Sequence, residues 1–328
     1  MIVLGFYVLK NLPRLEDPLI SLVVPVLNEE GCIEEFARRT REAAAKAGFR
    51  YEILFIDDGS SDMTPARIDE ARESDPHVKT VRFTRPFGHQ AALSAGLHYA
   101  EGEAIITMDG DLQHPPECLG DLVQAWREGA DVVYTDRHLT ERYQGSLKAR
   151  LSGLFYLALS RLTDLPPESS KADFRLMDRR AVEAFNRLDE HFIFVRGLVP
   201  WLGFPSTRIE YEVEDRFAGM PKFTPRRMVR LALDGIFSFS VVPLRLITFL
   251  GMLTTGLGMI YGFYALAKFF AGYVDSAGWT SLMVLILVFG GVQLMSLGIV
   301  SEYVGRIYEE VKGRPRFIID SLRGFEDR

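Results

Sequence analysis

The chain has 328 residues, of which 48% are hydrophobic and 25% are charged, a balance that excludes a disordered or fibrous protein. Its 44 acidic and 38 basic residues give a formal charge of −6, which argues against a nucleic-acid partner. The length predicts about two domains. The two cysteines, Cys32 and Cys118, form neither a CxxC pair nor a disulfide framework, which favours a reducing compartment for the soluble part.

Residues 1–19 are predicted to be an N-terminal lead-in to the first domain. They open with the apolar text MIVLGFYVL but have neither the basic region nor the small-residue cleavage site of a signal peptide. From residue 20 on the pattern changes to one that is typical of a folded domain.

Short apolar runs rich in β-branched residues alternate with helical stretches over the next part of the chain. The runs cover residues 20–26, 51–56, 78–83, 104–109 and 131–135, and the helical stretches cover 29–47, 65–73, 89–101 and 116–128. Continuous runs of this kind are typical of parallel strands that are buried on both faces. The alternation predicts an α/β domain over residues 20–223 with a doubly wound, mostly parallel sheet, which binds ligands beyond the carboxyl ends of its strands.

Polar clusters follow three of these strands. Residues 25–30 read PVLNEE, residues 57–62 read DDGSSD, and residues 109–113 read DGDLQ. Each cluster alone could be a turn or a helix cap, but three clusters at one sheet edge indicate a ligand site. The sequence has no Gly-rich loop of the dinucleotide or Walker type. A bound nucleotide would therefore need carboxylates and a metal ion at its pyrophosphate.

The DGD segment suits that task. Asp109 and Asp111 are separated by Gly110, which would let a ligand approach the backbone. Two carboxylates so close together repel each other unless a cation lies between them. Carboxylate and amide oxygens suit Mg²⁺ or Mn²⁺, and such an ion would neutralise the charge that develops on a leaving diphosphate.

Two long uncharged runs near the C-terminus, residues 246–267 and 276–301, are each long enough as helices to cross the roughly 30 Å of a bilayer core. They predict transmembrane helices at about 246–268 and 278–301, with a pair of buried helices in a soluble domain as the alternative. The preceding segment, residues 224–245, mixes arginines with apolar residues and predicts an amphipathic helix region in the headgroup plane, with an ordinary docking helix of the soluble domain as the alternative. Residues 302–328 are expected to be a C-terminal tail.

The distribution of cations predicts the orientation. The cations that flank the two runs on their outer sides are Arg226, Arg227, Arg230, Arg245, Arg306, Lys312, Arg314 and Arg316, whereas the connection between the runs holds only Lys268. This asymmetry predicts a multi-pass protein of the inner (cytoplasmic) membrane, with the first domain and both termini in the cytoplasm.

The segments VVPVLNEE, DDGSSD, FGHQAAL and DGDLQHPPE resemble those of family-two glycosyltransferases with the GT-A fold. Later segments, ADFRLMDRR, RGLVPWLGF, RFAGMPKF and the apolar C-terminal text, are similar to polyprenyl-phosphate glycosyltransferases of the bactoprenol glucosyltransferase and dolichol-phosphate mannosyltransferase type. The resemblance covers about residues 20–319. The sequence has no QxxRW motif of the processive synthases, so the resemblance favours a single transfer to a lipid.

The resemblance implies a role for each matching residue. The implied nucleotide-binding residues are Pro25, Leu27, Asn28, Glu29, Asp58, Asp109 and Gly110, and the implied metal ligands are Asp109, Asp111 and Gln113. The implied phosphate and acceptor residues are Arg137, Arg150, Arg216 and Lys222, and the implied catalytic residues are Asp111, Asp173 and Arg175. Asp173 would either orient the acceptor or act as a weak general base.

The resemblance further implies inverting transfer of a hexose, with UDP-glucose as donor and undecaprenyl phosphate as acceptor, by a homo-oligomer that uses Mg²⁺ or Mn²⁺. Three alternatives stay open at this point. One is a GDP-mannose-dependent mannosyltransferase, another is a non-catalytic membrane scaffold that kept a nucleotide-binding fold, and the third is a nucleotidyltransferase that makes the sugar nucleotide.

Overall fold

The computed structural model describes residues 14, 17–138, 173–188, 190, 193–212, 240–271 and 278–325. These residues fall into two compact units. One unit holds the described residues up to 212 together with 314–325, and the other holds residues 240–313. Each unit is built from different elements and is described separately.

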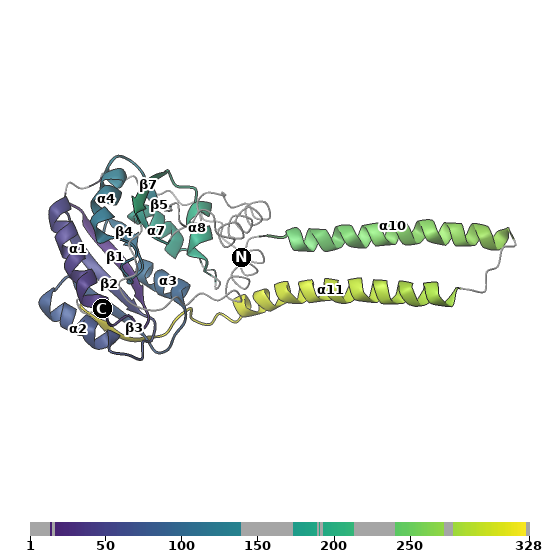
Figure 1. Ribbon diagram of the computed structural model, residues 1–328, viewed down its shortest axis with the longest axis horizontal. Helices are drawn as coiled ribbons and strands as arrows, with labels where there is room; N and C mark the ends of the chain where they lie inside the picture. Colours follow the sequence, from purple (N-terminus) through teal and green to yellow (C-terminus); the bar gives the residue numbers. More distant parts are fainter. Residues whose placement is uncertain are drawn as a thin grey trace, which may run out of the picture. The chain divides into compact units, whose positions relative to one another are not determined.

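The first unit is a sheet covered by helices. Its strands are β1 Leu19–Val26, β2 Arg50–Asp57, β3 Val78–Phe83, β4 Ala104–Thr107, β5 Val132–His138, β6 Arg175–Asp178, β7 Ser206–Glu212 and β8 Ile319–Arg323. Its helices are α1 Ile33–Ala47, α2 Thr64–Ser74, α3 His89–Tyr99, the 3-10 helix η1 Pro116–Cys118, α4 Leu119–Arg127, α7 Arg179–Asn186 and α8 Val195–Trp201. The described strands form one sheet in the order β7-β5-β6-β4-β1-β2-β3-β8 (Figure 1).

Most strands of this sheet run in the same direction. β1 pairs in parallel with β2 and β4, β3 pairs in parallel with β2, and β5 pairs in parallel with β7. β6 and β8 run antiparallel to their neighbours. The predicted α/β fold with a mostly parallel sheet is confirmed. The antiparallel β6 was not predicted, and it brings Arg175 opposite Thr107 at the end of β4.

The two faces of the sheet are covered by different helices. Residues Ile20, Leu22 and Val24 of β1 belong to one buried cluster with side chains of α1, α2 and α4, whereas α3, α7 and α8 lie on the other face (Figure 1). The approach of α3 is close, because a Cβ atom on Gly96 would lie 2.1 Å from Cγ1 of Val23. Side chains that alternate between two covered faces explain why the strand runs are continuously apolar.

The segment after residue 313, which lies in the predicted C-terminal tail over residues 302–328, belongs to the first unit and supplies the strand β8. β8 pairs antiparallel with β3, and the amide of Thr84 donates a hydrogen bond to the carbonyl of Ile318 at 3.0 Å. Just before β8, the ring of Phe317 stacks on Phe83 with centroids 5.0 Å apart. The physical reason is that β8 pairs the backbone groups that β3 would otherwise expose at a sheet edge.

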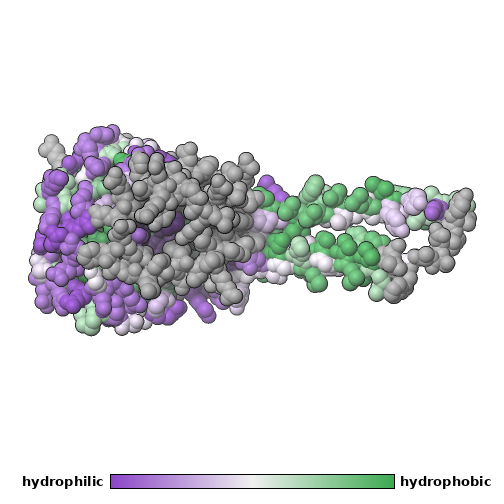
Figure 2. Space-filling model, viewed as in Figure 1, coloured by the Kyte–Doolittle hydropathy of each residue, from purple (hydrophilic) through white to green (hydrophobic). Residues whose placement is uncertain are grey.

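The second unit consists of two long helices, α10 Val242–Phe270 and α11 Trp279–Val311, which lie side by side (Figure 1). Within them, Val242–Lys268 and Leu282–Val311 are long and apolar enough to span a membrane, and neither is buried. Figure 2 shows the apolar side chains along both helices. The hydroxyl of Tyr303 donates a hydrogen bond to the carbonyl of Ser240 at 2.6 Å, which joins the two helices near one end. The predicted interfacial region 224–245 lies mostly outside the described residues.

Candidate active site at the carboxyl edge of the sheet

The parallel strands β1, β2, β3 and β4 all end at one edge of the sheet. The polar clusters predicted from the sequence follow β1, β2 and β4 at this edge. The segment that precedes β6 joins them, because β6 runs antiparallel to β4 and therefore begins where β4 ends. The hydroxyl of Thr107 donates a hydrogen bond to the carbonyl of Asp173, which fixes Asp173 beside the DGD segment.

The loops after β1 and β2 are cross-linked. Asn28 adopts φ 54°, a left-handed conformation that Asn tolerates. Its amide donates to Oγ of Ser60 at 3.0 Å, and its side-chain oxygen accepts from the amide of Ser61 at 2.9 Å. The amide of Glu29 donates to Oγ1 of Thr64 at 2.9 Å. These hydrogen bonds therefore hold the predicted nucleotide-binding residues at the end of β1 against the segment after β2. Among them Pro25 is buried, and Leu27 and Glu29 are half-buried.

Asp58 braces a third loop. Its buried carboxylate accepts hydrogen bonds from the amides of Phe87 at 2.6 Å and Gly88 at 2.9 Å. Burial raises the pKa of Asp58, and these two amide hydrogen bonds oppose that shift. Gly59 follows with φ 73°, and a Cβ atom there would lie 2.7 Å from the carbonyl carbon of Arg85. Asp58 therefore sets the position of the loop that leads into α3, and its contact with a nucleotide stays a prediction.

The DGD segment contains one accessible and one nearly buried carboxylate. The side chain of Asp109 is 35% exposed, and its two carboxylate oxygens lie 3.8 Å from Nε2 of His89 and from Nδ1 of His114. The amide of Asp109 donates to Nδ1 of His114 at 3.0 Å. Asp111 is nearly buried, and its Oδ1 accepts from the amide of Gln113 at 3.2 Å. The side chain of Asp109 is thus accessible to a ligand, while hydrogen bonds to His114 and Asp111 hold the turn on which it lies.

Gly110 has a packing role in this turn. A Cβ atom at this position would lie 2.9 Å from Cγ1 of Val26 and 3.2 Å from Cγ1 of Val24. The glycine therefore lets the turn lie directly on β1. The sequence suggested that Gly110 leaves room for a ligand, and that suggestion stays a prediction.

The donor set of this segment suits a hard cation. Among the described residues no group of three His, Cys, Asp or Glu side chains is placed to hold a metal ion. Mg²⁺ in particular is usually held by one or two carboxylates, with the remaining ligands from water and substrate phosphates. Asp109, Asp111 and Gln113 therefore fit an ion that is shared with a diphosphate, and they do not make a closed cage by themselves.

Asp173 lies at the centre of a cluster of cationic side chains. Its carboxylate accepts two hydrogen bonds from Arg196, from Nε at 2.7 Å and from Nη2 at 2.5 Å. Nε2 of His89 lies 3.1 Å from the same carboxylate, and Nη2 of the fully buried Arg175 lies 3.7 Å from it. The predicted catalytic pair of Asp173 and Arg175 is thus brought together with two further residues.

The charges of this cluster shift its pKa values. Burial alone would raise the pKa of Asp173, but hydrogen bonds from His89 and Arg196 outweigh burial and hold that pKa well below its usual range. Burial would lower the pKa of His89, but its hydrogen bond with Asp173 and the charge of Asp109 raise it instead. A carboxylate with so low a pKa is a poor proton acceptor, which favours the orienting role for Asp173.

Sequence reasoning missed three residues of this edge as individual site residues. His89, Arg196 and His114 each lie inside a segment that carried the resemblance, namely FGHQAAL, RGLVPWLGF and DGDLQHPPE. His114 is buried, and its ring stacks on Phe174 with centroids 4.9 Å apart. These segments were the available signal, but only the fold shows that they meet.

Of the four predicted phosphate-binding residues, the structure describes the backbone of one, Arg137. Arg137 lies near the carboxyl end of β5, opposite Tyr211 of β7, so its backbone is at the same edge as the carboxylates. Arg150, Arg216 and Lys222 lie outside the described residues. Their roles stay predictions.

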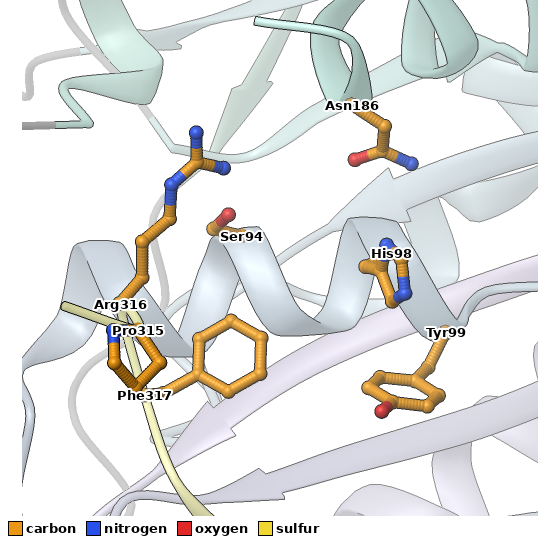
Figure 3. A pocket seen from close by; sticks show the side chains of 7 residues that line it. All are labelled: Ser94, His98, Tyr99, Asn186, Pro315, Arg316 and Phe317. Atoms are coloured by element: carbon orange, nitrogen blue, oxygen red, sulfur yellow. The ribbon is translucent and has the colours of Figure 1, made fainter. Parts of the chain in front are cut away.

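A separate pocket of about 220 Å³ lies on the outer side of α3 (Figure 3). Ser94 and His98 of α3, Asn186 of α7 and Arg316 are among its lining residues. None of the site residues predicted from the sequence lines it. The predicted site residues that the structure describes lie at the carboxyl edge of the sheet and not at this pocket.

Comparison with known proteins shows the family of this chain. Residues 21–185, about half of the chain, match the model of glycosyl transferase family 2. The chain belongs to this family. Residues 242–307 match a second model, the GtrB C-terminal hairpin, which covers most of α10 and α11. The fold of this family-2 glycosyltransferase is GT-A-like.

Several curated sequences are similar to this glycosyltransferase along nearly the whole chain. The uncharacterized glycosyltransferase YkcC of Bacillus subtilis (strain 168) is 42% identical, over 94% of this chain and 95% of the relative. The bactoprenol glucosyl transferase of Shigella phage SfII is 41% identical, over 92% and 97%. The prophage bactoprenol glucosyl transferase homolog of Escherichia coli (strain K12) is 39% identical, over 93% and 99%.

Solved structures are more distant. The mannosyltransferase PcManGT from Pyrobaculum calidifontis has a TM-score of 0.47 and 16% identity, over 91% of this chain and 88% of that chain. A glucosyl-3-phosphoglycerate synthase from Mycobacterium tuberculosis has a TM-score of 0.46 and 20% identity, over 67% and 77%. The sequence relatives, and not these structures, show the family.

Proposed function

We propose that this glycosyltransferase moves a hexose from a nucleotide diphospho-sugar to a polyprenyl phosphate, with inversion at the sugar carbon. UDP-glucose is the proposed donor and undecaprenyl phosphate the proposed acceptor. One observation carries the proposal: a single chain joins a carboxylate edge suited to a diphosphate to two exposed helices that are apolar enough to enter a membrane. Relatives that bear the name bactoprenol glucosyl transferase match over both parts.

The donor half of the reaction takes place at the end of β4. Asp109 and Asp111, with Gln113, would hold Mg²⁺ or Mn²⁺ at the donor diphosphate, and the ion would supply neutralisation of the charge on the leaving group. The braced loop of Asn28 and Glu29 would receive the base and ribose, because it lies at the same strand edge. Because hydrogen bonds already hold this loop in place, little conformational entropy would be lost when the donor binds.

The acceptor half of the reaction needs orientation more than proton removal. A phosphate monoester has a second pKa of about 6, so the lipid phosphate is already largely anionic at neutral pH. Asp173, whose pKa is held low by His89 and Arg196, would then act as an orienting anion and not as a base. Arg137, Arg150, Arg216 and Lys222 are proposed to hold the phosphates, since arginine forms paired hydrogen bonds with phosphate oxygens.

The two apolar helices would anchor the enzyme where its acceptor is found. A polyprenyl chain stays in the bilayer, so anchoring raises the effective concentration of the lipid phosphate at the site. The excess of cations on the outer flanks of the helices supports a cytoplasmic catalytic domain and cytoplasmic termini at the inner membrane. Association of several copies is part of the proposal.

A donor panel tests the proposal directly. The full chain in detergent is incubated with undecaprenyl phosphate, Mg²⁺ or Mn²⁺, and radiolabelled UDP-glucose, UDP-galactose or GDP-mannose in separate reactions. We expect label in the organic phase from UDP-glucose, and at least about 10²-fold less product from Asp111→Ala, because the ion's site is lost. Asp121→Ala, which removes an exposed carboxylate of α4, is the matched control and should keep normal turnover.

The outcomes separate the alternatives. Label from GDP-mannose alone would replace the donor and leave the reaction class unchanged. No lipid product from any donor, together with no nucleotide binding, would favour the scaffold. Equal turnover by Asp111→Ala and Asp121→Ala would contradict the metal assignment.

A further inference from the structure

The residues around Asp173 differ in how far a substrate can reach them. The side chain of Asp173 is 3% exposed and that of Arg175 is fully buried, whereas Arg196 is 24% exposed and His89 is 40% exposed. A substrate at this edge can therefore touch the imidazole of His89 while the carboxylate of Asp173 stays beneath it. The group that the sequence predicted to face the acceptor is not the one that the structure exposes.

The position of the His89 ring links the two halves of the site. Nε2 lies 3.1 Å from Oδ2 of Asp173 and 3.8 Å from Oδ1 of Asp109. Because an ionised carboxylate can only accept, Nε2 donates its hydrogen to Asp173. A carboxylate that accepts from one ring nitrogen fixes the direction of the whole imidazole, as it does for histidines that bind metals or take part in catalysis. The ring is thus held between the donor carboxylate and the buried anion.

The backbone on both sides of this contact is also fixed. His89 is the first residue of α3, and the two preceding amides are bound by the carboxylate of Asp58. The side-chain oxygen of Gln90 accepts a hydrogen bond from the amide of Val195 at 2.8 Å, which places the next residue, Arg196, beside Asp173. The contacts of His89, Gln90 and Asp173 therefore join α3, α8 and the segment before β6.

We propose that His89 contacts a phosphate of the substrates, and that Asp173 and Arg196 are positioning residues that act on the reaction by holding His89. The proposal rests on the proposed function, since it requires a reaction that brings phosphates to this edge. With Nε2 donating to Asp173, Nδ1 is the ring nitrogen left for the substrate, and in the protonated ring it donates a hydrogen bond to a phosphate oxygen. The ligand is a phosphate of the sugar nucleotide or of the lipid, and kinetics can tell these two sources apart.

The first test uses single variants of the full chain in detergent with the donor that the unsubstituted enzyme uses. We expect His89→Ala to lower kcat/KM by about 10²-fold, as loss of one aimed hydrogen-bond donor does in other enzymes. A rise in KM for the sugar nucleotide would identify the donor phosphate, and a rise in KM for the lipid would identify the acceptor phosphate. His98→Ala, which removes another exposed histidine of α3, is the matched control. It should leave kcat/KM and the KM values for both substrates unchanged.

The second test asks whether Asp173 and Arg196 act through His89. We expect Arg196→Gln and Asp173→Asn each to lower kcat/KM by about 10-fold or more, and the pair His89→Ala with Arg196→Gln to be no slower than His89→Ala alone within about 3-fold. Independent roles would instead multiply the two losses. Thermal unfolding and calorimetric binding of UDP, measured on each variant, show whether the variant is folded.

The result that overturns the proposal is specific. A folded His89→Ala variant with unchanged kcat/KM, or a double variant whose loss is the product of the single losses, contradicts it. If Asp173→Asn does not fold, Arg196→Gln and His89→Ala still decide the question. Failure of the proposed function has a different signature, because the unsubstituted enzyme itself would then give no lipid product with any donor.

Discussion

At the scale of single residues, Asp173 shows how neighbours decide what a carboxylate can do. Two guanidinium groups and an imidazole surround it, and its pKa lies well below the ordinary value of about 3.9. A lowered pKa means that this group stabilises the folded state above about pH 4 and loses that contribution as the pH falls through the folded pKa. Asp173 is therefore ionised throughout the range in which the enzyme would be assayed.

This ionisation predicts a pH dependence. The acid limb of kcat/KM between pH 5 and 8 should belong to a substrate phosphate, because Asp173 does not titrate there. We expect Asp173→Asn to lower kcat/KM by a similar factor at every pH and to leave the midpoint of the acid limb in place. Loss of the acid limb in this variant would show that Asp173 is the titrating base.

Gly59 and Gly48 form a matched pair for a second residue-scale prediction. Both have a left-handed φ, 73° and 67°, but a Cβ atom on Gly59 would meet the backbone of Arg85, whereas nothing lies within 4 Å of one on Gly48. Gly48→Ala should cost roughly 1–2 kcal/mol from its φ alone. Gly59→Ala should cost at least about 2 kcal/mol more, since backbone atoms must move.

Chemical unfolding of the two glycine variants measures this difference. Calorimetric titration of the two variants with UDP should show weaker binding only for Gly59→Ala. That residue lies between the loop of Asp58 and the loop that leads into α3. Equal destabilisation of the two variants would contradict the close approach.

The sequence predicted the chemistry of many single residues but not their contacts. The spacing of Asp109 and Asp111 led to the prediction of a cation site, because two nearby carboxylates repel each other without a counterion. The contact of His89 with Asp173 could not be predicted, since the two residues are 84 positions apart in the chain and meet only after β4 and β6 pair. Residue type is local information, whereas contact depends on the fold.

At the scale of elements, the strands that the sequence predicted are those with a continuous apolar run. β1 to β5 carry continuous apolar runs, whereas β6 is buried but reads RLMD, with a charged residue at each end, and β7 and β8 lie at the edges of the sheet. Charged ends and exposed edge positions interrupt the apolar run by which a strand is predicted. The predicted helix over 29–47 begins at Ile33, since the residues before it form the loop that is braced against Thr64.

The docking of the C-terminal segment gives an element-scale prediction. Phe317 is half-buried against Phe83, so Phe317→Ala should lower the free energy of unfolding by roughly 2 kcal/mol, about half the cost at a fully buried phenylalanine. Leu322→Ala, on the exposed side of β8, should change it by less than about 0.5 kcal/mol. Thermal unfolding measures both, and equal values would contradict the docking.

At the scale of the whole molecule, the chain joins a catalytic sheet to helices whose apolar side chains are exposed along their length. An arginine in the middle of a membrane helix costs about 3 kcal/mol, and one at its end costs far less. Leu287→Arg in α11 should therefore reduce the fraction of protein retained in membranes after alkaline extraction, while Val311→Arg at the end of α11 should not. Equal retention of both variants would contradict a membrane span.

The central claim is that the carboxylates at the end of β4 hold the donor diphosphate through a divalent cation. Anomalous diffraction from crystals of the full chain grown with Mn²⁺ and UDP-glucose tests it most directly. We expect one strong manganese peak within about 2.5 Å of oxygens of Asp109 or Asp111, with the diphosphate bound to the same ion. Nucleotide density at another place on the sheet, with no manganese between these two residues, would contradict the account.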